Sequence, residues 1–282
     1  MMKQETTIKV YTASVGCLED PQLFGKWLHC VPQVRREKAE GPKNPEVRKL
    51  SLGAGALLVH ALRDYAADRE SRGGRPVASR DDPSGNALSS TDLRSLRIAE
   101  NEHGKPYLPD WPELHFSLSH SGDRVMCAVS RSEVGCDVEE AGSDEADRRR
   151  IGYIARCLTE RERALALADP AAFYKIWTLK ESFLKLTGKG LTIPLASFEV
   201  TPDPVSIRQD ILEGTVTARV YGPFDGYQYA CAALEGRIPE EMTFVDLREA
   251  LEEELEHESN IEGSDQAVPG KNQEGSGGHG GQ

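Results

Sequence analysis

Two segments of the sequence carry carboxylates at spacings that could support chemistry. In the first, Asp137 and Glu139 are two residues apart, so on a strand both side chains point to one face. Two carboxylates within roughly 7 Å repel one another unless a positive charge lies between them. Mg²⁺ prefers hard oxygen ligands and takes few from protein, which leaves room for water and phosphate. The pair is therefore a candidate metal site; the competing interpretation is an exposed polar strand face.

The second segment, residues 173–190, has the pattern of an amphipathic helix. Its apolar residues recur at three- and four-residue steps, which predicts a buried stripe, and Gly188 marks the end of the helix. Trp177, Glu181 and Lys185 are each four residues apart, so they stack on the opposite face. Beside the strand, Glu181 would supply a third carboxylate. The alternative is a solvated face whose Glu181–Lys185 pair is worth roughly 0.3–0.5 kcal/mol.

Basic residues elsewhere in the chain could complement these carboxylates. A highly charged phosphate ligand needs cations that converge from several elements. Taken singly, each cation is more often a solvated surface charge, and the histidine, which follows a predicted strand, could instead cap its turn. The candidates are Arg35, Lys38, Arg48, Lys49, Lys105, His120 and Lys185.

Composition and missing motifs exclude several classes of protein. The sequence contains no Gly-x4-Gly-Lys-Ser/Thr loop and no Gly-x-Ser-x-Gly, and its single Gly-x-Gly-x-x-Gly spacing, at 275–280, lies in the Gly-rich tail with no predicted strand before it. These features argue against NTPases, dinucleotide enzymes and α/β-hydrolases. A net charge of -12 argues against a general nucleic-acid partner. The six cysteines lack zinc-site spacing and are expected to be reduced. No apolar run could span a bilayer and no apolar leader begins the sequence, so we expect a cytoplasmic protein with no membrane partner.

Alternating and periodic segments predict the elements that must position these side chains. Strands are expected at 8–15, 96–98, 114–118, 125–129, 134–139, 197–200, 215–220 and 227–234. Helices are expected around residues 24–28 and at 46–69, 144–157, 160–168, 173–187 and 239–257. Thr159 and Glu162 have capping-box spacing, 35–38 is expected to be a basic turn, and 71–91 to be an exposed loop.

The order of these elements predicts an α+β fold with two similar lobes and a cleft between them. The boundaries expected are 1–130 for the N-terminal lobe, 131–257 for the C-terminal lobe and 258–282 for a disordered tail. The tail is rich in Gly, Ser and Gln, a composition that buries too little apolar surface to fold.

Three motifs in this order resemble those of the 4′-phosphopantetheinyl transferases. They are His115-Phe-Ser-Leu-Ser-His-Ser-Gly122, Gly135-Cys-Asp-Val-Glu139 and Trp177-x-x-Lys-Glu-x-x-x-Lys185. Gly104-Lys-Pro106 and Gly188-Lys-Gly-Leu191 also fit. The resemblance covers about residues 5–250 and is to the larger, surfactin-synthetase-activating (Sfp-like) type, a pseudodimeric single chain. Any one motif alone would be weak, whereas the ordered set is specific.

The resemblance implies that the phosphopantetheine arm of coenzyme A is transferred to a serine of an apo acyl or peptidyl carrier protein, releasing 3′,5′-ADP. It also implies a monomer. The implied Mg²⁺ ligands are Asp137, Glu139 and Glu181. The implied contacts to coenzyme A are Arg35, Lys38, Lys105, Ser119, His120 and Lys185. The implied catalytic groups are Glu181, Lys185 and His120, with Glu181 as the first choice of base, directly or through water.

The sequence departs from the family pattern at the start of the first long helix, where a basic residue is common. Depending on the alignment, this residue is Lys49, with Arg48 beside it, or is replaced by Leu50. The 71–90 loop is also longer than expected. Two other classes stay open: a Mg²⁺-dependent hydrolase of the coenzyme A diphosphate, and a non-catalytic carrier-binding module. Fatty-acid, polyketide and nonribosomal-peptide carriers are all compatible with the sequence.

Overall fold

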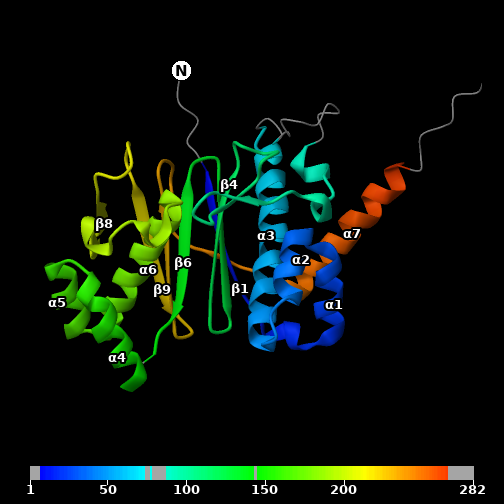
Figure 1. Ribbon diagram of the computed structural model, residues 1–282. Helices are drawn as coiled ribbons and strands as arrows, with labels where there is room; N and C mark the ends of the chain where they lie inside the picture. The colour runs from blue at the N-terminus through cyan, green and yellow to red at the C-terminus, as the bar shows by residue number, and fades with distance from the viewer. Residues whose placement is uncertain (1–6, 74–76, 78–86, 143–144, 266–282) are drawn as a thin grey trace, which may run out of the picture.

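The computed structural model describes residues 7–73, 77, 87–142 and 145–265. It contains both helices and sheets, as the predicted α+β class requires. In Figure 1 the main strands stand in the middle of the molecule, with a group of helices on each side. Within the described residues, no helix combines the length and the apolar character that crossing a membrane requires.

Four strands form the first sheet, in the order β11-β1-β5-β4. Their bounds are β1 Ile8–Ser14, β4 His115–Ser121, β5 Arg124–Ser130 and β11 Thr243–Phe244. β5 is antiparallel to both β1 and β4, and β11 is parallel to β1. The β4–β5 turn needs Gly122, whose φ is 53°, because a Cβ there would come within 2.4 Å of the Tyr227 hydroxyl.

One group of helices covers this sheet (Figure 1). α3 packs on β1, β4 and β5, and the other three helices pack against α3. The bounds are α1 Pro21–Cys30, α2 Gln33–Glu40, α3 Pro45–Ser71 and α7 Leu247–Asp265. Leu57, Leu58 and Leu62 of α3 are fully buried at the centre of this layer. The Trp27 indole on α1 donates a hydrogen bond to the Leu247 carbonyl at 2.9 Å, which ties α7 to α1.

Three strands form the second sheet, in the order β6-β10-β9, and both neighbouring pairs are antiparallel. The bounds are β6 Val134–Glu140, β9 Thr217–Phe224 and β10 Tyr227–Ala233. α6 packs on β6 and β10, and α4 and α5 lie beyond it. These helices span α4 Glu145–Ile154, α5 Glu160–Ala168 and α6 Pro170–Thr187. Two small hairpins complete the fold: β2 Ala99–Glu100 with β3 Pro106–Tyr107, and β7 Glu199–Pro202 with β8 Val205–Arg208.

Three local predictions were wrong. The helix expected to begin at 239 begins only at Leu247, and β11 lies in the segment before it. Residues 35–38, expected to be a turn, belong to α2, because Gln, Val, Arg, Glu, Lys and Ala are all compatible with a helix and Gln33 bonds Glu37 one turn later. Residues 96–98 are not a strand: a 3-10 turn at Leu93–Ser95, capped by the Asp92 carboxylate, precedes them, and β2 begins only at Ala99.

The C-terminal segment differs from the expected boundaries. Residues 243–265 return to the first layer, since β11 pairs with β1 and α7 packs on α1 and α3. α7 begins at Leu247, after Asp246 accepts a hydrogen bond from the Arg248 amide, and runs through 258–265, where we expected disorder. Leu247, Ala250 and Leu251 bury its apolar stripe. The rest of the predicted tail, 266–282, and most of the predicted loop, at 74–76 and 78–86, lie outside the described residues.

Candidate active site at the junction of the two sheets

Asp137 on β6 is buried, with only 4% of its surface exposed. Its Oδ1 accepts hydrogen bonds from Lys185 Nζ on α6 and from Ser119 Oγ on β4, each at 2.7 Å. Its Oδ2 is also buried and has no hydrogen-bond partner among the described residues. α6 comes this close to β6 because residue 135 is glycine: a Cβ there would lie 2.0 Å from the Ser182 carbonyl oxygen. Three elements therefore meet at one carboxylate.

Glu139 is two residues further along β6 and is half-buried. Its Oε1 accepts a hydrogen bond from the Trp177 indole at 2.9 Å, and its Oε2 accepts one from Arg150 Nη2 at 3.0 Å. Trp177 stacks on Phe173, so the indole is held in place on the polar face of α6. This contact explains why a tryptophan occupies a helix face that otherwise carries charges.

Glu181 lies one turn after Trp177 on α6, and the charges of both β6 carboxylates act on it. Its pKa is raised from 4.5 to about 7, first by burial and then by the charges of Asp137 and Glu139, which Lys185 only partly offsets. Burial also raises the pKa of Asp137 despite its bond to Lys185. Burial opposes the Lys185 charge, but the attraction of Asp137 outweighs it and raises the pKa of Lys185. Carboxylates outnumber cations here, so the cluster as a whole favours protonation or a bound cation.

The donor set suits a hard divalent cation, although the side chains do not already form a cage. Among the described residues, no three His, Cys, Asp or Glu side chains stand in a ready metal-binding arrangement. The unpartnered Asp137 Oδ2 and the Glu181 carboxyl, whose pKa is raised, are nevertheless oxygen ligands of the kind that Mg²⁺ prefers. Glu139 could join them if its Oε2 gave up the hydrogen bond that it accepts from Arg150. The residue types therefore fit a magnesium ion, provided that the side chains rearrange.

His120 lies near enough to two cations, Lys185 and Arg35, for their charges to act on it. The His120 side chain on β4 reaches solvent, yet its pKa is lowered by partial burial and then by the charges of Lys185 and Arg35. Arg35 on α2 donates to the Ser51 carbonyl at 2.8 Å, and its buried Nε has no hydrogen-bond partner among the described residues. Burial lowers the pKa of Arg35. An anion bound between His120 and these two cations would offset the repulsion that lowers the His120 pKa.

Comparison with known proteins adds an independent line of observation. The model of the 4′-phosphopantetheinyl transferase superfamily matches residues 133–232, which include β6, α6 and the three carboxylates. The chain is 33% identical over 168 residues to the 4′-phosphopantetheinyl transferase Sfp of Bacillus subtilis (strain 168), an alignment that covers 57% of this chain and 73% of that protein. A second Bacillus subtilis relative, 4′-phosphopantetheinyl transferase ffp, is 32% identical over 158 residues, which cover 53% of this chain and 68% of the relative.

This chain belongs to the 4′-phosphopantetheinyl transferase superfamily. The resemblance to the Sfp-like type and the predicted enzyme class are thereby confirmed. The family model matches only residues 133–232, so that match covers α6 and β6 but not the basic residues of α2 and β4.

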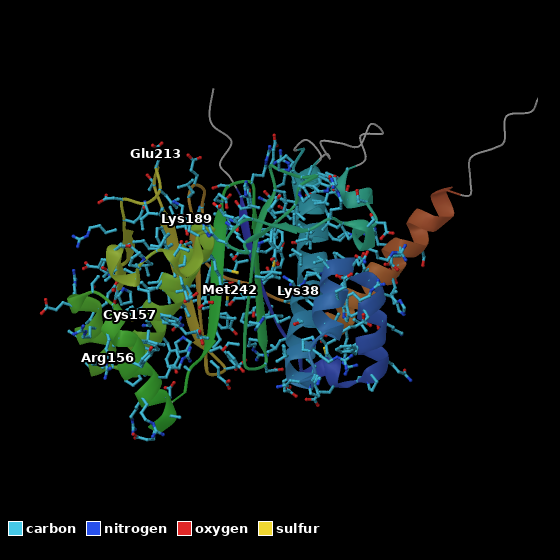
Figure 2. All side chains as sticks on the ribbon, in the orientation of Figure 1. Lys38, Arg156, Cys157, Lys189, Glu213 and Met242 are labelled. Atoms are coloured by element: carbon cyan, nitrogen blue, oxygen red, sulfur yellow. The ribbon has the colours of Figure 1, made fainter. Side chains whose placement is uncertain are left out.

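In this phosphopantetheinyl transferase, two of the predicted nucleotide contacts already have protein partners. Lys38 on α2, which Figure 2 labels between the strands and the helices of the first layer, pairs with Glu100. Lys105 Nζ pairs with Glu133 and donates to the Leu186 carbonyl at 3.0 Å. A phosphate that binds either lysine must compete with these carboxylates.

A groove of about 240 Å³ runs past Lys105 to Lys185. Its walls are the turn that contains Gly104 and Pro106, the strand β4 and the C-terminal end of α6. Its lining includes the apolar residues Phe116 and Leu184.

Arg48 and Lys49 are not among the groups that meet Asp137. The Arg48 guanidinium lies over the Phe24 ring and donates to the Ala39 carbonyl. Lys49 Nζ pairs with Glu46 at 2.9 Å and with Glu19 at 3.0 Å. Both line a groove of about 470 Å³ whose lining includes none of the three carboxylates. This larger groove is thus separate from the carboxylate cluster.

Sequence reasoning missed Arg150 and the serines that flank Ser119. Arg150 ends a run of three arginines on α4, a pattern that suggests only a solvated basic face. Ser117 and Ser121 alternate with apolar or ring side chains along β4, which is a signal for a shared face but not for a partner strand. Their contacts with β6 become visible only in the fold.

Proposed function

We propose that this enzyme transfers the 4′-phosphopantetheine arm of coenzyme A to a serine of an apo carrier protein, with Mg²⁺, and releases 3′,5′-ADP. The observation that carries the proposal is the buried, half-partnered Asp137, held by Lys185 and surrounded by two further carboxylates. We further propose that the two sheets with their helices are the lobes of a pseudodimer, and that the site lies in the cleft between them.

In this proposal Asp137, Glu139 and Glu181 hold the ion. When bound, it would neutralise charge on the diphosphate of coenzyme A and polarise the β-phosphate. The unpartnered Asp137 Oδ2 supports this assignment, because a buried carboxylate oxygen without a partner costs free energy unless a ligand compensates it.

Glu181 would act as the general base. Without the ion its pKa is raised to about 7; a bound cation would favour the carboxylate form, which can accept a proton. The carrier serine Oγ attacks the β-phosphorus, the bond from that phosphorus to the bridging oxygen breaks, and 3′,5′-ADP carries the electron pair away. The serine proton goes to Glu181, directly or through water.

Lys185 and His120 would hold the phosphates during this step. Lys185 stays charged beside Asp137, so it can donate to a diphosphate oxygen. His120 has a lowered pKa, which a bound phosphate would raise again. Ser119 Oγ already accepts a hydrogen bond from Lys185 Nζ at 2.7 Å, so this hydroxyl lies beside the amine that would hold the diphosphate.

The nucleotide half of coenzyme A would extend from Lys185 along the groove beside Lys105, with Arg35 and Lys38 toward its 3′-phosphate. The apolar residues in the lining of the groove support a purine, and the unpartnered Arg35 Nε supports an anion. Arg48 and Lys49 have other partners, so we assign them no direct contact. A cytoplasmic location and a monomeric state stay predictions from the sequence.

The experiment incubates the protein with coenzyme A and Mg²⁺, with and without purified apo acyl and peptidyl carrier proteins, and follows carrier mass and coenzyme A. Transfer predicts a carrier heavier by the phosphopantetheine arm, and loss of coenzyme A only when carrier is present. Loss of coenzyme A without carrier would indicate the hydrolase. No change, with carrier bound, would indicate the binding module. Asp137→Ala should abolish transfer, whereas Glu140→Ala, at the exposed end of the same strand, should not.

A further inference from the structure

Three serine hydroxyls of β4 accept hydrogen bonds from backbone N–H groups of β6. The donors are the amides of Cys136, Val138 and Glu140, at 3.0, 3.4 and 3.0 Å, and the acceptors are Ser117, Ser119 and Ser121 Oγ in the same order. We call this set of contacts the serine ladder. Its members share one face of β4, because strand side chains alternate.

The serine ladder joins two strands that belong to different sheets. β4 is the last strand of the first sheet and pairs with β5, whereas β6 is the first strand of the second sheet and pairs with β10. Each contact links residues 19 positions apart, so the two strands run parallel with a constant register. The outward N–H groups of an edge strand need acceptors, and here side-chain oxygens replace the carbonyls of a neighbouring strand.

The same hydroxyls also face the carboxylates of β6. Ser119 Oγ donates to Asp137 Oδ1 at 2.7 Å, and Ser121 Oγ lies 3.5 Å from Glu139 Oε2, at the long end of hydrogen bonding. Each of these serines therefore touches one carboxylate and the amide of the residue that follows it. A slip of β6 along β4 would break every one of these contacts and would turn the carboxylates away from Lys185.

We propose that Ser117 and Ser121 are positioning residues that fix β6 in register with β4 and so place Asp137 and Glu139 for the divalent ion. This inference rests on the proposed function, because it assumes that these carboxylates hold the ion. Partners that orient metal ligands typically change metal affinity by 10–100-fold when they are removed. Ser117 touches no carboxylate in the structure, so any effect of its removal must pass through the strand.

The alternative is that the hydroxyls only satisfy buried amides and stabilise the fold. Ser14 on β1 offers a matched control for that role. Its Oγ donates to Asp123 Oδ2 at 2.5 Å and accepts from the Gly16 amide at 3.1 Å, so it makes the same two kinds of bond, but to the β4–β5 turn and to its own segment rather than to β6. Losing this hydroxyl should affect stability without moving β6.

The test measures Mn²⁺ binding to the full chain without coenzyme A, by electron paramagnetic resonance of the free ion, for wild type, Ser117→Ala, Ser121→Ala, Ser121→Thr and Ser14→Ala. Amide hydrogen exchange and Tm are recorded for each. We expect about tenfold weaker Mn²⁺ binding in Ser117→Ala and Ser121→Ala. We expect wild-type binding in Ser14→Ala and in Ser121→Thr, which keeps the hydroxyl on a strand that tolerates β-branched residues. The Cys136 and Glu140 amides should exchange faster in the matching alanine variants.

Each result has a defined meaning. Mn²⁺ affinities of Ser117→Ala and Ser121→Ala equal to that of Ser14→Ala would overturn the positioning role, whatever their Tm. Unchanged exchange of the Cys136 and Glu140 amides would overturn the serine ladder itself. Absence of Mn²⁺ binding by the wild-type protein would instead overturn the metal site of the proposed function, a result that the variants cannot mimic.

Discussion

Replacing Glu181 by glutamine should stabilise the metal-free protein at neutral and alkaline pH while it removes the proposed base. The reason lies in the carboxylate cluster, where burial and the charges of Asp137 and Glu139 raise the Glu181 pKa from 4.5 to about 7. A carboxyl with a raised pKa in the folded state stabilises the fold below pH 4.5. That contribution is lost as the pH rises through about 7. Above pH 7 the folded protein must therefore carry an unfavourable charge, which glutamine does not have.

The size of this change in stability follows from the shift in the Glu181 pKa. A rise from 4.5 to about 7 corresponds to about 3 kcal/mol of unfavourable free energy above pH 7. Because the charges are coupled, we expect about 1–3 kcal/mol of stabilisation at pH 8 and little at pH 5. For a protein of this size, that is roughly 2–10 °C in Tm.

The assay is thermal unfolding of wild type and Glu181→Gln with a chelator present, at pH 5 and pH 8. Glu139→Gln is the matched control: Glu139 accepts bonds from Trp177 and Arg150, so this variant should lose stability. Added Mg²⁺ should raise the Tm of wild type more than that of Glu181→Gln, since ligand binding stabilises the folded state. A Glu181→Gln protein that is less stable than wild type at pH 8, or equally shifted at both pH values, would refute the reasoning.

Three further predictions follow from single contacts. Lys180→Met should cost about 3–5 kcal/mol, seen as a large fall in Tm, because the fully buried Lys180 pairs with Glu162 at 2.8 Å; a fall no larger than that of a surface variant would contradict it. Arg150→Ala should tighten Mn²⁺ binding a few-fold, since it frees Glu139 Oε2, and weaker binding would show that Arg150 helps the site. Arg35→Ala should raise the KM for coenzyme A about tenfold with little change in kcat, and an unchanged KM would remove the nucleotide from this position.

Much of the local structure could be predicted because its signals are local. The Thr159–Glu162 capping box forms as its spacing predicts, and α6 ends at Gly188 in a left-handed conformation. The failures arose where a segment had no strong pattern of its own. The basic residues of α2 suggested a turn, although their helix propensity was sufficient to form a helix. The position of α7 depends on an apolar stripe that packs on α1 and α3.

The sequence by itself determined which chemistry was available: two carboxylates on one face of a strand, and Trp177, Glu181 and Lys185 on one face of a helix. These relations depend on the periods of strands and helices, which short stretches of sequence contain. Only the tertiary structure decided that the strand and the helix meet, through Gly135 and the Asp137–Lys185 pair, and that Arg48 and Lys49 have other partners. It also decided that β4 serines bond β6 amides, because contacts between two sheets depend on packing that no local period encodes.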